Sequence, residues 1–131
     1  MTLITFDTLP AAVADRPAAE RCLGTPPLRL TQSVYQGDGG AVDCGLWQCE
    51  PGAWRIAFHE GRHEFFQVLE GRLRIRDEAG VAREFGPGEA CVIPAGFRGI
   101  FEVIEPVRKY YVMVDRPPTT AGAAPGNQEH A

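Results

Sequence analysis

Short runs of alternating apolar and polar residues follow one another along the middle of the chain and predict β-strands. Residues two apart on a strand share a face, so this alternation indicates strands with one buried face. Strands are expected at residues 28–35, 42–50, 53–58, 64–69, 73–77, 81–85, 90–93, 99–104 and 107–114. Glycine and proline turn signals separate these runs, and none has a convincing helical period. The pattern predicts an all-β, single-domain protein.

The two ends of the chain differ from this middle region. Residues 1–27 hold a short β-like run at residues 3–6 and then an Ala/Pro-rich segment, which predicts an N-terminal arm packed on a neighbour. The barrel domain is expected at residues 28–115. Residues 116–131 contain no large apolar residue, so we expect a disordered tail.

Composition narrows the class of protein. The 131 residues suit one domain, and a net charge of −4 argues against a nucleic-acid partner. No apolar run approaches the roughly 18 residues of a membrane span, and the N-terminus lacks the basic region of a signal peptide, so a cytoplasmic protein is expected. Twelve arginines accompany a single lysine, Lys109, and we attribute this bias to genome composition rather than to an anion-binding surface.

The four cysteines have no CxxC spacing, so we expect small buried hydrophobes rather than a zinc site or a disulfide. They are Cys22, Cys44, Cys49 and Cys91.

Glu64 is the most informative residue for function. If Val68 points into the barrel, Phe66 and Glu64 do so too, and His63 faces the other way. Burying a carboxylate without a partner costs about several kcal/mol of folding free energy. Glu64 is therefore expected to have a metal, a cation or a donor network as its partner.

Histidines near Glu64 suggest a metal site as one hypothesis. His59 lies five positions earlier, and Gly61 permits a bend that could turn it toward Glu64. Imidazole and carboxylate suit Zn, Mn, Fe or Ni, and His63 is the third candidate ligand of this incomplete set. In the alternative interpretation, His59 and Glu64 only hydrogen-bond to each other or to water.

Aromatic residues supply the material for a ligand pocket. Those expected closest to a cavity are Trp47, Phe66, Phe101 and Tyr110. Arg72, Arg74 and Arg76 share the face opposite Leu73 and Ile75, which predicts a solvated or dimer-contacting ridge, with anion binding as the lesser alternative.

These residues also resemble the cupin superfamily. Its first motif has a glycine, a His-x-His pair, a glutamate and a further glycine, and its second reads Gly-x5-Pro-x-Gly-x2-His. The chain matches the motifs at His59, Glu64, Gly71, Gly88, Pro94 and Gly96. The resemblance extends over residues 28–115 and implies a cupin-type β-barrel, that is, a jelly roll or double-stranded β-helix.

Two of the four usual cupin metal ligands are absent, because Ala57 and Gly99 occupy histidine positions. Either the metal is lost, which we prefer, or His63 and a residue such as Glu60 compensate. Finer features at residues 45–52, 94–99 and 107–112 are similar to the (S)-ureidoglycine aminohydrolase cupin domain and the ethanolamine-utilisation cupin. The former family holds manganese with Glu-x-His-x3-His plus a glutamine, and only the two histidines are kept here.

The resemblance implies a pocket for a small polar metabolite. One expectation is an enzyme of nitrogenous or carbonyl compounds with Glu64 and His59 as catalytic residues, using either a divalent metal as a Lewis acid or acid–base chemistry alone. The alternative is a non-catalytic binding or sensing module with a degenerate metal site. A purely structural role is a third alternative, but it explains an inward carboxylate poorly. We also expect a homodimer, because open barrel edges favour pairing.

Overall fold

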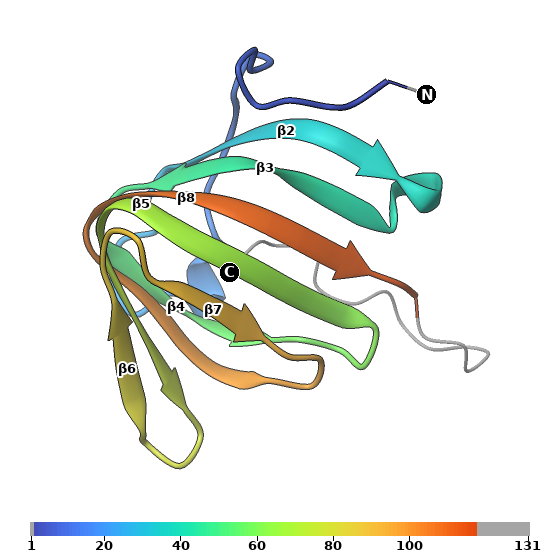
Figure 1. Ribbon diagram of the computed structural model, residues 1–131. Helices are drawn as coiled ribbons and strands as arrows, with labels where there is room; N and C mark the ends of the chain where they lie inside the picture. The colour runs from blue at the N-terminus through green and yellow to red at the C-terminus, as the bar shows by residue number, and fades with distance from the viewer. Residues whose placement is uncertain (1, 118–131) are drawn as a thin grey trace.

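Two long strands, β5 (Arg62–Asp77) and β8 (Arg98–Asp115), run side by side through the molecule and organise its sheet (Figure 1). The computed structural model describes residues 2–117. The disordered tail predicted for residues 116–131 lies almost wholly outside the described residues. Within them, the all-β barrel predicted from the alternation is confirmed.

The remaining elements are short. They are β1 (Val13–Asp15), the 3₁₀ turn η1 (Ala19–Arg21), β2 (Arg29–Gly37), the 3₁₀ turn η2 (Asp38–Gly40), β3 (Val42–Cys49), β4 (Gly52–Ala57), β6 (Ala82–Phe85) and β7 (Ala90–Ile93). Among residues 2–117, no helix is long and apolar enough to cross a membrane.

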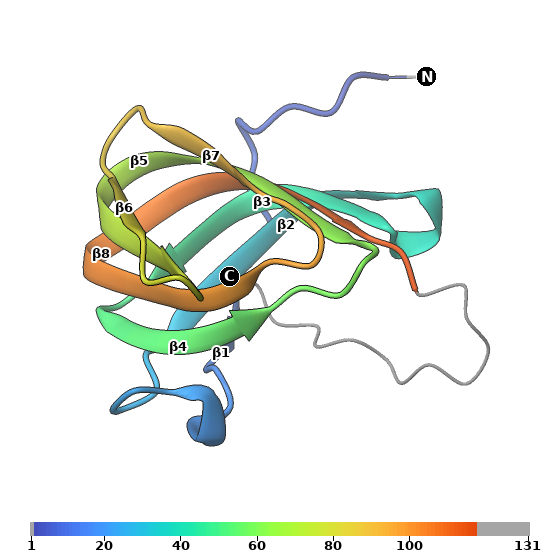
Figure 2. The same cartoon turned by 90° about the horizontal axis from the view of Figure 1, so that it is seen from below.

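Every strand pairing is antiparallel, and β5 and β8 take part in both halves of the barrel. Residues 107–114 of β8 pair with β3, and β5 pairs beside them with β7. Residues 98–103 of β8 pair with β4, and residues 72–77 of β5 lie on their other side, next to β6. Seen from below, the two halves curve around a common interior (Figure 2).

The sequence predicted four strands where the structure has two. Residues 64–69 and 73–77 belong to the continuous β5, and residues 99–104 and 107–114 to the continuous β8. Gly71 and Pro106, interpreted as turn residues, instead lie where both strands bend and their register shifts. Gly71 has φ +84°, and a Cβ there would lie 2.0 Å from the Pro106 carbonyl oxygen, so the bend requires glycine.

The N-terminal segment packs on the barrel of its own chain. The predicted β-like run at residues 3–6 is not a strand, whereas β1 was not predicted and pairs with β2. Asp15 of β1 accepts two hydrogen bonds from Arg29, at 2.6 and 2.9 Å, and Arg29 is almost fully buried. Asp15 and Arg29 are paired in the β1–β2 register, and their charged contact stabilises the position of a strand of only three residues.

Aromatic rings fill the barrel between its two halves. Trp47, Trp54 and Phe66 all pack against Phe101, with ring centroids 5.2–6.5 Å apart. All four side chains are fully buried, and each stabilises the fold by about 1.5–3 kcal/mol or more through its apolar area. Any polar group inside the barrel therefore lies in a water-poor, aromatic environment.

Candidate functional site

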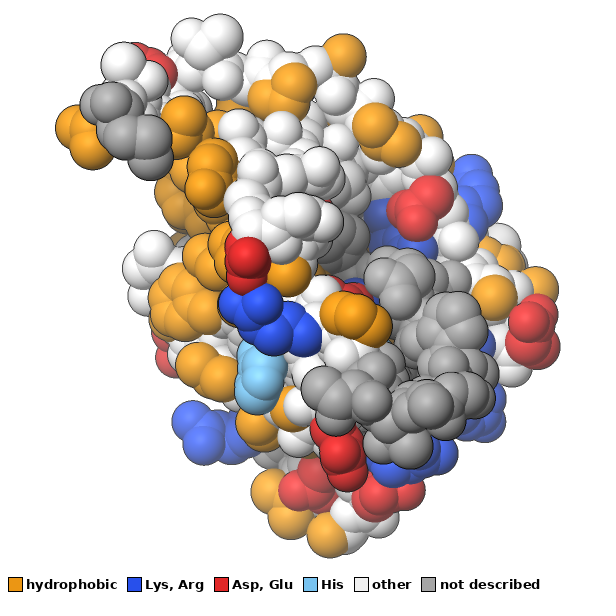
Figure 3. All heavy atoms as spheres, turned by 90° about the vertical axis from the view of Figure 1, so that its right-hand side faces the viewer, with side chains coloured by type: hydrophobic (Ala, Val, Ile, Leu, Met, Phe, Trp, Pro, Cys, Tyr) orange, Lys and Arg blue, Asp and Glu red, His pale blue; other side chains and the backbone are white. Residues whose placement is uncertain are grey.

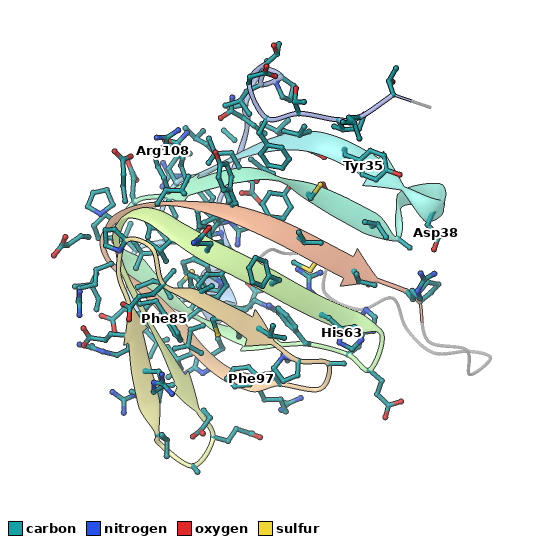
Figure 4. The ribbon with its side chains drawn as sticks, viewed as in Figure 1. Tyr35, Asp38, His63, Phe85, Phe97 and Arg108 are labelled. Atoms are coloured by element: carbon teal, nitrogen blue, oxygen red, sulfur yellow. The ribbon has the colours of Figure 1, made fainter. Side chains whose placement is uncertain are left out.

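Glu64 points into this aromatic interior, as the alternation of its strand predicted. Glu64, Phe66 and Val68 have no exposed surface, whereas His63 and Phe65 lie on the outer face of β5. In Figure 4, His63 lies where β5 begins, at the opposite end of the sheet from Arg108.

The partner of Glu64 is a lysine from β8. Lys109 donates a hydrogen bond from Nζ to Glu64 Oε2 over 2.6 Å, and both side chains are completely buried. In the second half of β8, the inward face consists of Val107, Lys109, Tyr111 and Met113. Of the partners that the sequence left open for Glu64, the structure therefore contains a cation from the chain itself.

Three aromatic rings surround the Lys109 ammonium. Its Nζ lies 4.4 Å from the ring centroid of Trp47, 4.6 Å from that of Phe66 and 4.9 Å from that of Phe101. A desolvated cation is attracted to the negative face of an aromatic ring, so these rings offset part of the hydration that Lys109 loses. Three of the four aromatics expected near a cavity are thus gathered around one charge.

Two polar atoms beside this charge have no hydrogen-bond partner among the described residues. They are the second carboxylate oxygen of Glu64, Oε1, and the indole nitrogen of Trp47, Nε1. A buried polar atom without a partner costs about 1–3 kcal/mol. The indole nitrogen of Trp54, Nε1, is likewise buried without a partner among the described residues, so the aromatic interior presents one carboxylate acceptor and two indole donors that a small molecule could satisfy.

Burial changes the proton affinity of Lys109. Desolvation lowers the pKa of its ammonium below the ordinary value of lysine, while the adjacent Glu64 carboxylate acts in the opposite direction. Loss of hydration is the larger effect, so this amine gives up its proton more readily than an exposed lysine. That property suits a group that donates a proton in a reaction.

Tyr110 is placed differently from the prediction. It lies on the outer face of β8, 39% exposed, and packs edge-on against Phe6 at 5.1 Å. Tyr111 occupies the inward position instead, where its hydroxyl donates to Asp43. Tyr110 is thus not a wall of the barrel interior.

His59 belongs to a second polar cluster, at the loop between β4 and β5. Its Nε2 lies 2.7 Å from Asp115, and its Nδ1 accepts a hydrogen bond from the Gly61 backbone, so Nε2 carries the proton that Asp115 accepts. Arg62 donates to the other oxygen of Asp115 at 2.8 Å. No hydrogen bond joins His59 to Glu64 in the described structure, so the proposed catalytic residues pair with different partners.

The residues at the cupin metal positions do not fit a metal ion. Ala57 has no ligand atom, and a Cβ at Gly99 would lie 2.1 Å from the Arg76 carbonyl oxygen, which leaves no room for a side chain. Both nitrogens of His59 are occupied, and His63 lies on the opposite face of β5 from Glu64. Residues 2–117 contain no group of three or more His, Cys, Asp or Glu residues placed to hold a metal.

All four cysteines are free thiols, and burial raises the pKa of three of them. Cys49 is the extreme case, with a pKa raised to about 12. A thiol that stays protonated is a poor nucleophile and a poor metal ligand. The expected role as buried hydrophobes is confirmed for Cys49, whereas Cys22, Cys44 and Cys91 are partly exposed.

Sequence reasoning missed Lys109 as a site residue. It was noticed only as the single lysine among the basic residues, although its alternation with Val107 and Tyr111 could have placed it on the face that Glu64 also occupies. The signal was obscured because Tyr110 and Val112 make the outer face of β8 apolar as well.

Comparison with known proteins agrees with the all-β barrel fold. The family model of the EutQ-like cupin domain matches residues 36–111. A DUF861-family protein of unknown function from Pseudomonas syringae pv. tomato is 18% identical with a TM-score of 0.70, and the match covers 79% of this chain and 44% of that one. The chain thus spans less than half of that relative. No curated protein matches significantly.

Two ethanolamine-utilisation proteins have similar folds. A putative ethanolamine utilization protein Q from Salmonella typhimurium is 25% identical with a TM-score of 0.57, over 66% of this chain and 69% of that one. The Clostridium difficile EutQ protein is 21% identical with a TM-score of 0.58, over 68% of this chain and 64% of that one.

Proposed function

The chain belongs to the EutQ-like cupin domain family, and we propose that its barrel binds a small polar molecule through Glu64 and Lys109. The observation that carries this proposal is the fully buried 2.6 Å contact between the two, beside a carboxylate oxygen without a partner among the described residues. A pair that served stability alone would be expected to satisfy both oxygens, since an unpaired one costs free energy. Both side chains are buried, so the ligand reaches them only when neighbouring side chains move.

The ligand class follows from the groups that face it. Glu64 Oε1 requires a donor, and Trp47 Nε1 requires an acceptor. The interior already holds one positive and one negative charge, so a charged ligand would add an uncompensated ion in a water-poor space. We therefore infer a neutral nitrogenous or carbonyl compound with an N–H or O–H donor and a carbonyl acceptor.

Acid–base chemistry is the reaction type that this pair supports. Lys109, with its lowered pKa, donates a proton to a developing negative charge on the ligand, and Glu64 accepts a proton from the ligand's N–H or O–H group. No step in this scheme passes through a metal. The cation that balances Glu64 is the Lys109 ammonium, and elemental analysis of the purified protein should find well below one transition metal per chain.

A non-catalytic binding or sensing module remains the second candidate. Ala57 and Gly99 at the family's metal positions favour it, because they remove the Lewis acid that cupin enzymes commonly use.

Calorimetric titration with acetamide, N-methylurea and hydantoin tests the binding proposal, with acetate and methylammonium as charged comparisons. We expect saturable binding of at least one neutral probe, weakened at least tenfold by Glu64→Gln and by Lys109→Met. The matched controls are Glu70→Gln and Arg108→Met, which alter a partly exposed ion pair and should leave affinity within twofold. Affinity that the interior variants leave unchanged would contradict the proposal, as would the absence of binding.

Turnover separates the two candidates. NMR spectra of a bound probe, followed over hours with protein present, should show conversion that Lys109→Met abolishes if the chain is an enzyme. Binding without conversion would favour the sensing module.

A further inference from the structure

Four arginines surround a depression on the outside of the barrel, away from Glu64 and Lys109. The depression has a volume of about 560 Å³ and lies between β4, the first part of β8 and the turn after β5. Its basic residues are Arg21, Arg55, Arg76 and Arg98. Only two carboxylates, Asp77 and Glu78, lie among its lining residues, although the whole chain has a net charge of −4.

The strand register explains how the arginines come together. Ile100 of β8 is paired with Arg55 of β4 on one side and with Arg76 of β5 on the other. Residues in register on neighbouring strands point to the same face, and Arg98, two positions before Ile100, shares that face. Neighbouring strands are about 4.8 Å apart, so Arg55 and Arg76 flank Ile100 at about 10 Å from each other. Figure 2 shows these three strands side by side.

The buried residues next to them in sequence confirm that Arg55, Arg76 and Arg98 face outward. Trp54 and Ile56 on β4, Ile75 on β5 and Phe101 on β8 are in the core, and the arginines between them are exposed. The sheet itself therefore separates this depression from the barrel interior, and the inference does not depend on the proposed function.

Two arginines of the depression, Arg55 and Arg76, have no carboxylate partner among the described residues, unlike the arginines next to them. Arg72 and Arg74 of the predicted ridge form ion pairs with Glu84 at 2.8 and 2.7 Å. The Arg55 guanidinium, in contrast, makes no hydrogen bond or ion pair with the described residues, and that of Arg76 donates there only to the backbone carbonyl of Gly80. The Arg55 backbone carbonyl accepts a hydrogen bond from Arg21 at 3.5 Å.

The nearby carboxylates compensate only in part, because two of them line the depression against four arginines. Arg98 lies 3.6 Å from Glu78, and both side chains are more than half exposed, so this pair is weak. Asp77 accepts a hydrogen bond from the Val81 backbone and is engaged in the turn.

We propose that this depression is a binding site for a small organic anion that carries two or more phosphate or carboxylate groups. A guanidinium group donates two parallel hydrogen bonds to such groups, and arginines about 10 Å apart can hold the two ends of one ligand. Ile100, partly exposed between them, offers an aliphatic surface for the carbon skeleton of the ligand.

Titration calorimetry with pyrophosphate and with citrate tests the proposal. In the Arg55→Gln/Arg76→Gln variant, we expect the Kd of at least one probe to rise at least tenfold. The control variant Arg83→Gln/Arg108→Gln changes the net charge equally at positions outside the depression and should raise the Kd less than twofold. Figure 4 shows Arg108 far from the turn after β5.

Each outcome decides the proposal. Binding of pyrophosphate alone assigns a phosphate ligand, and binding of citrate alone assigns a carboxylate ligand. Equal weakening by both double variants would show attraction by net charge only and would overturn the site, as would the lack of saturable binding by both probes. If the double variant fails to fold, the single variants and the Nε–H signals of arginine in the wild-type chain, followed by NMR during titration, give the same decision.

Discussion

Lys109 has its charged end among three aromatic rings, where it donates a hydrogen bond to the buried carboxylate of Glu64. Breaking a buried ion pair by removing one partner leaves the other charge uncompensated, which costs about 3–5 kcal/mol. We expect Lys109→Met to lower the free energy of unfolding by about this amount, measured by denaturant titration. Lys109→Met/Glu64→Gln should be less destabilised, because it removes both charges.

An ion pair at the protein surface provides the control for these variants. Arg108→Met/Glu70→Gln removes a partly exposed pair and should change the free energy of unfolding by less than about 1 kcal/mol. A Lys109→Met variant as stable as the wild type would contradict the buried pair.

The lowered pKa of Lys109 gives stability a pH dependence with a definite sign. Between its pKa in the folded chain and its ordinary value of 10.5, the unfolded chain binds more protons than the folded chain. The free energy of unfolding therefore rises with pH in this window, by at most about 1.4 kcal/mol per pH unit. Unfolding curves recorded up to pH 10.5 should show this rise relative to Lys109→Met/Glu64→Gln. Parallel curves for the two proteins would contradict it.

The inward direction of Glu64 was predictable because its strand has one clearly apolar face, with Phe66 and Val68. The inward direction of Lys109 was not predictable, because residues 107–113 of β8 are apolar on both faces. Hydrophobicity alone favours Tyr110 and Val112 as core residues there. The Glu64–Lys109 contact also joins residues 45 positions apart, and such a distance in sequence is bridged only by the register of β5 and β8.

At the scale of elements, β5 and β8 bend without interruption at positions where the sequence predicts turns. Glycine and proline mark a change of chain direction, and a bend that carries a strand from one half of the barrel to the other has the same signal as a reversal. The strand content was therefore predictable from the sequence, whereas the continuity through Gly71 and Pro106 was not.

Gly71 and Gly80 form a matched pair that tests this bend. Their φ angles are +84° and +87°, but an added Cβ meets the Pro106 carbonyl at Gly71 and open space at Gly80. Gly80→Ala should cost about 1–2 kcal/mol from backbone strain alone. Gly71→Ala should lower the free energy of unfolding at least twice as much, measured by thermal and denaturant unfolding. Equal losses would show that the close approach does not constrain the chain.

At the scale of the whole molecule, one outer face is apolar. Phe65, Val92, Tyr110 and Val112 expose 39–60% of their surface, and Phe6, Phe65, Tyr110 and Val112 line a common depression there. Figure 3 shows hydrophobic side chains gathered along one side of the molecule. None of these residues is charged, so a second copy of the chain can meet this face without bringing like charges together.

The homodimer expected from the sequence stays a prediction, and this face is where we expect it. Leu3 and Ile4 are exposed next to Phe6 and extend the apolar surface available to a partner. Light scattering should give twice the mass of 14.3 kDa for the wild type and a monomer for Val112→Lys. Val81→Lys, at a valine that is 60% exposed and follows the turn after β5, is the control and should remain dimeric. A wild-type monomer would contradict the prediction.

The central place of β8 has a consequence for synthesis of the protein. β3, β4 and β5 all pair with this one strand, which is the last of the described strands to leave the ribosome. Until residues 98–115 emerge, these three strands have unpaired edges toward the missing neighbour, and Glu64 has no lysine to meet. The nascent chain therefore cannot close its barrel early, and in that interval it is most exposed to aggregation and most dependent on chaperones.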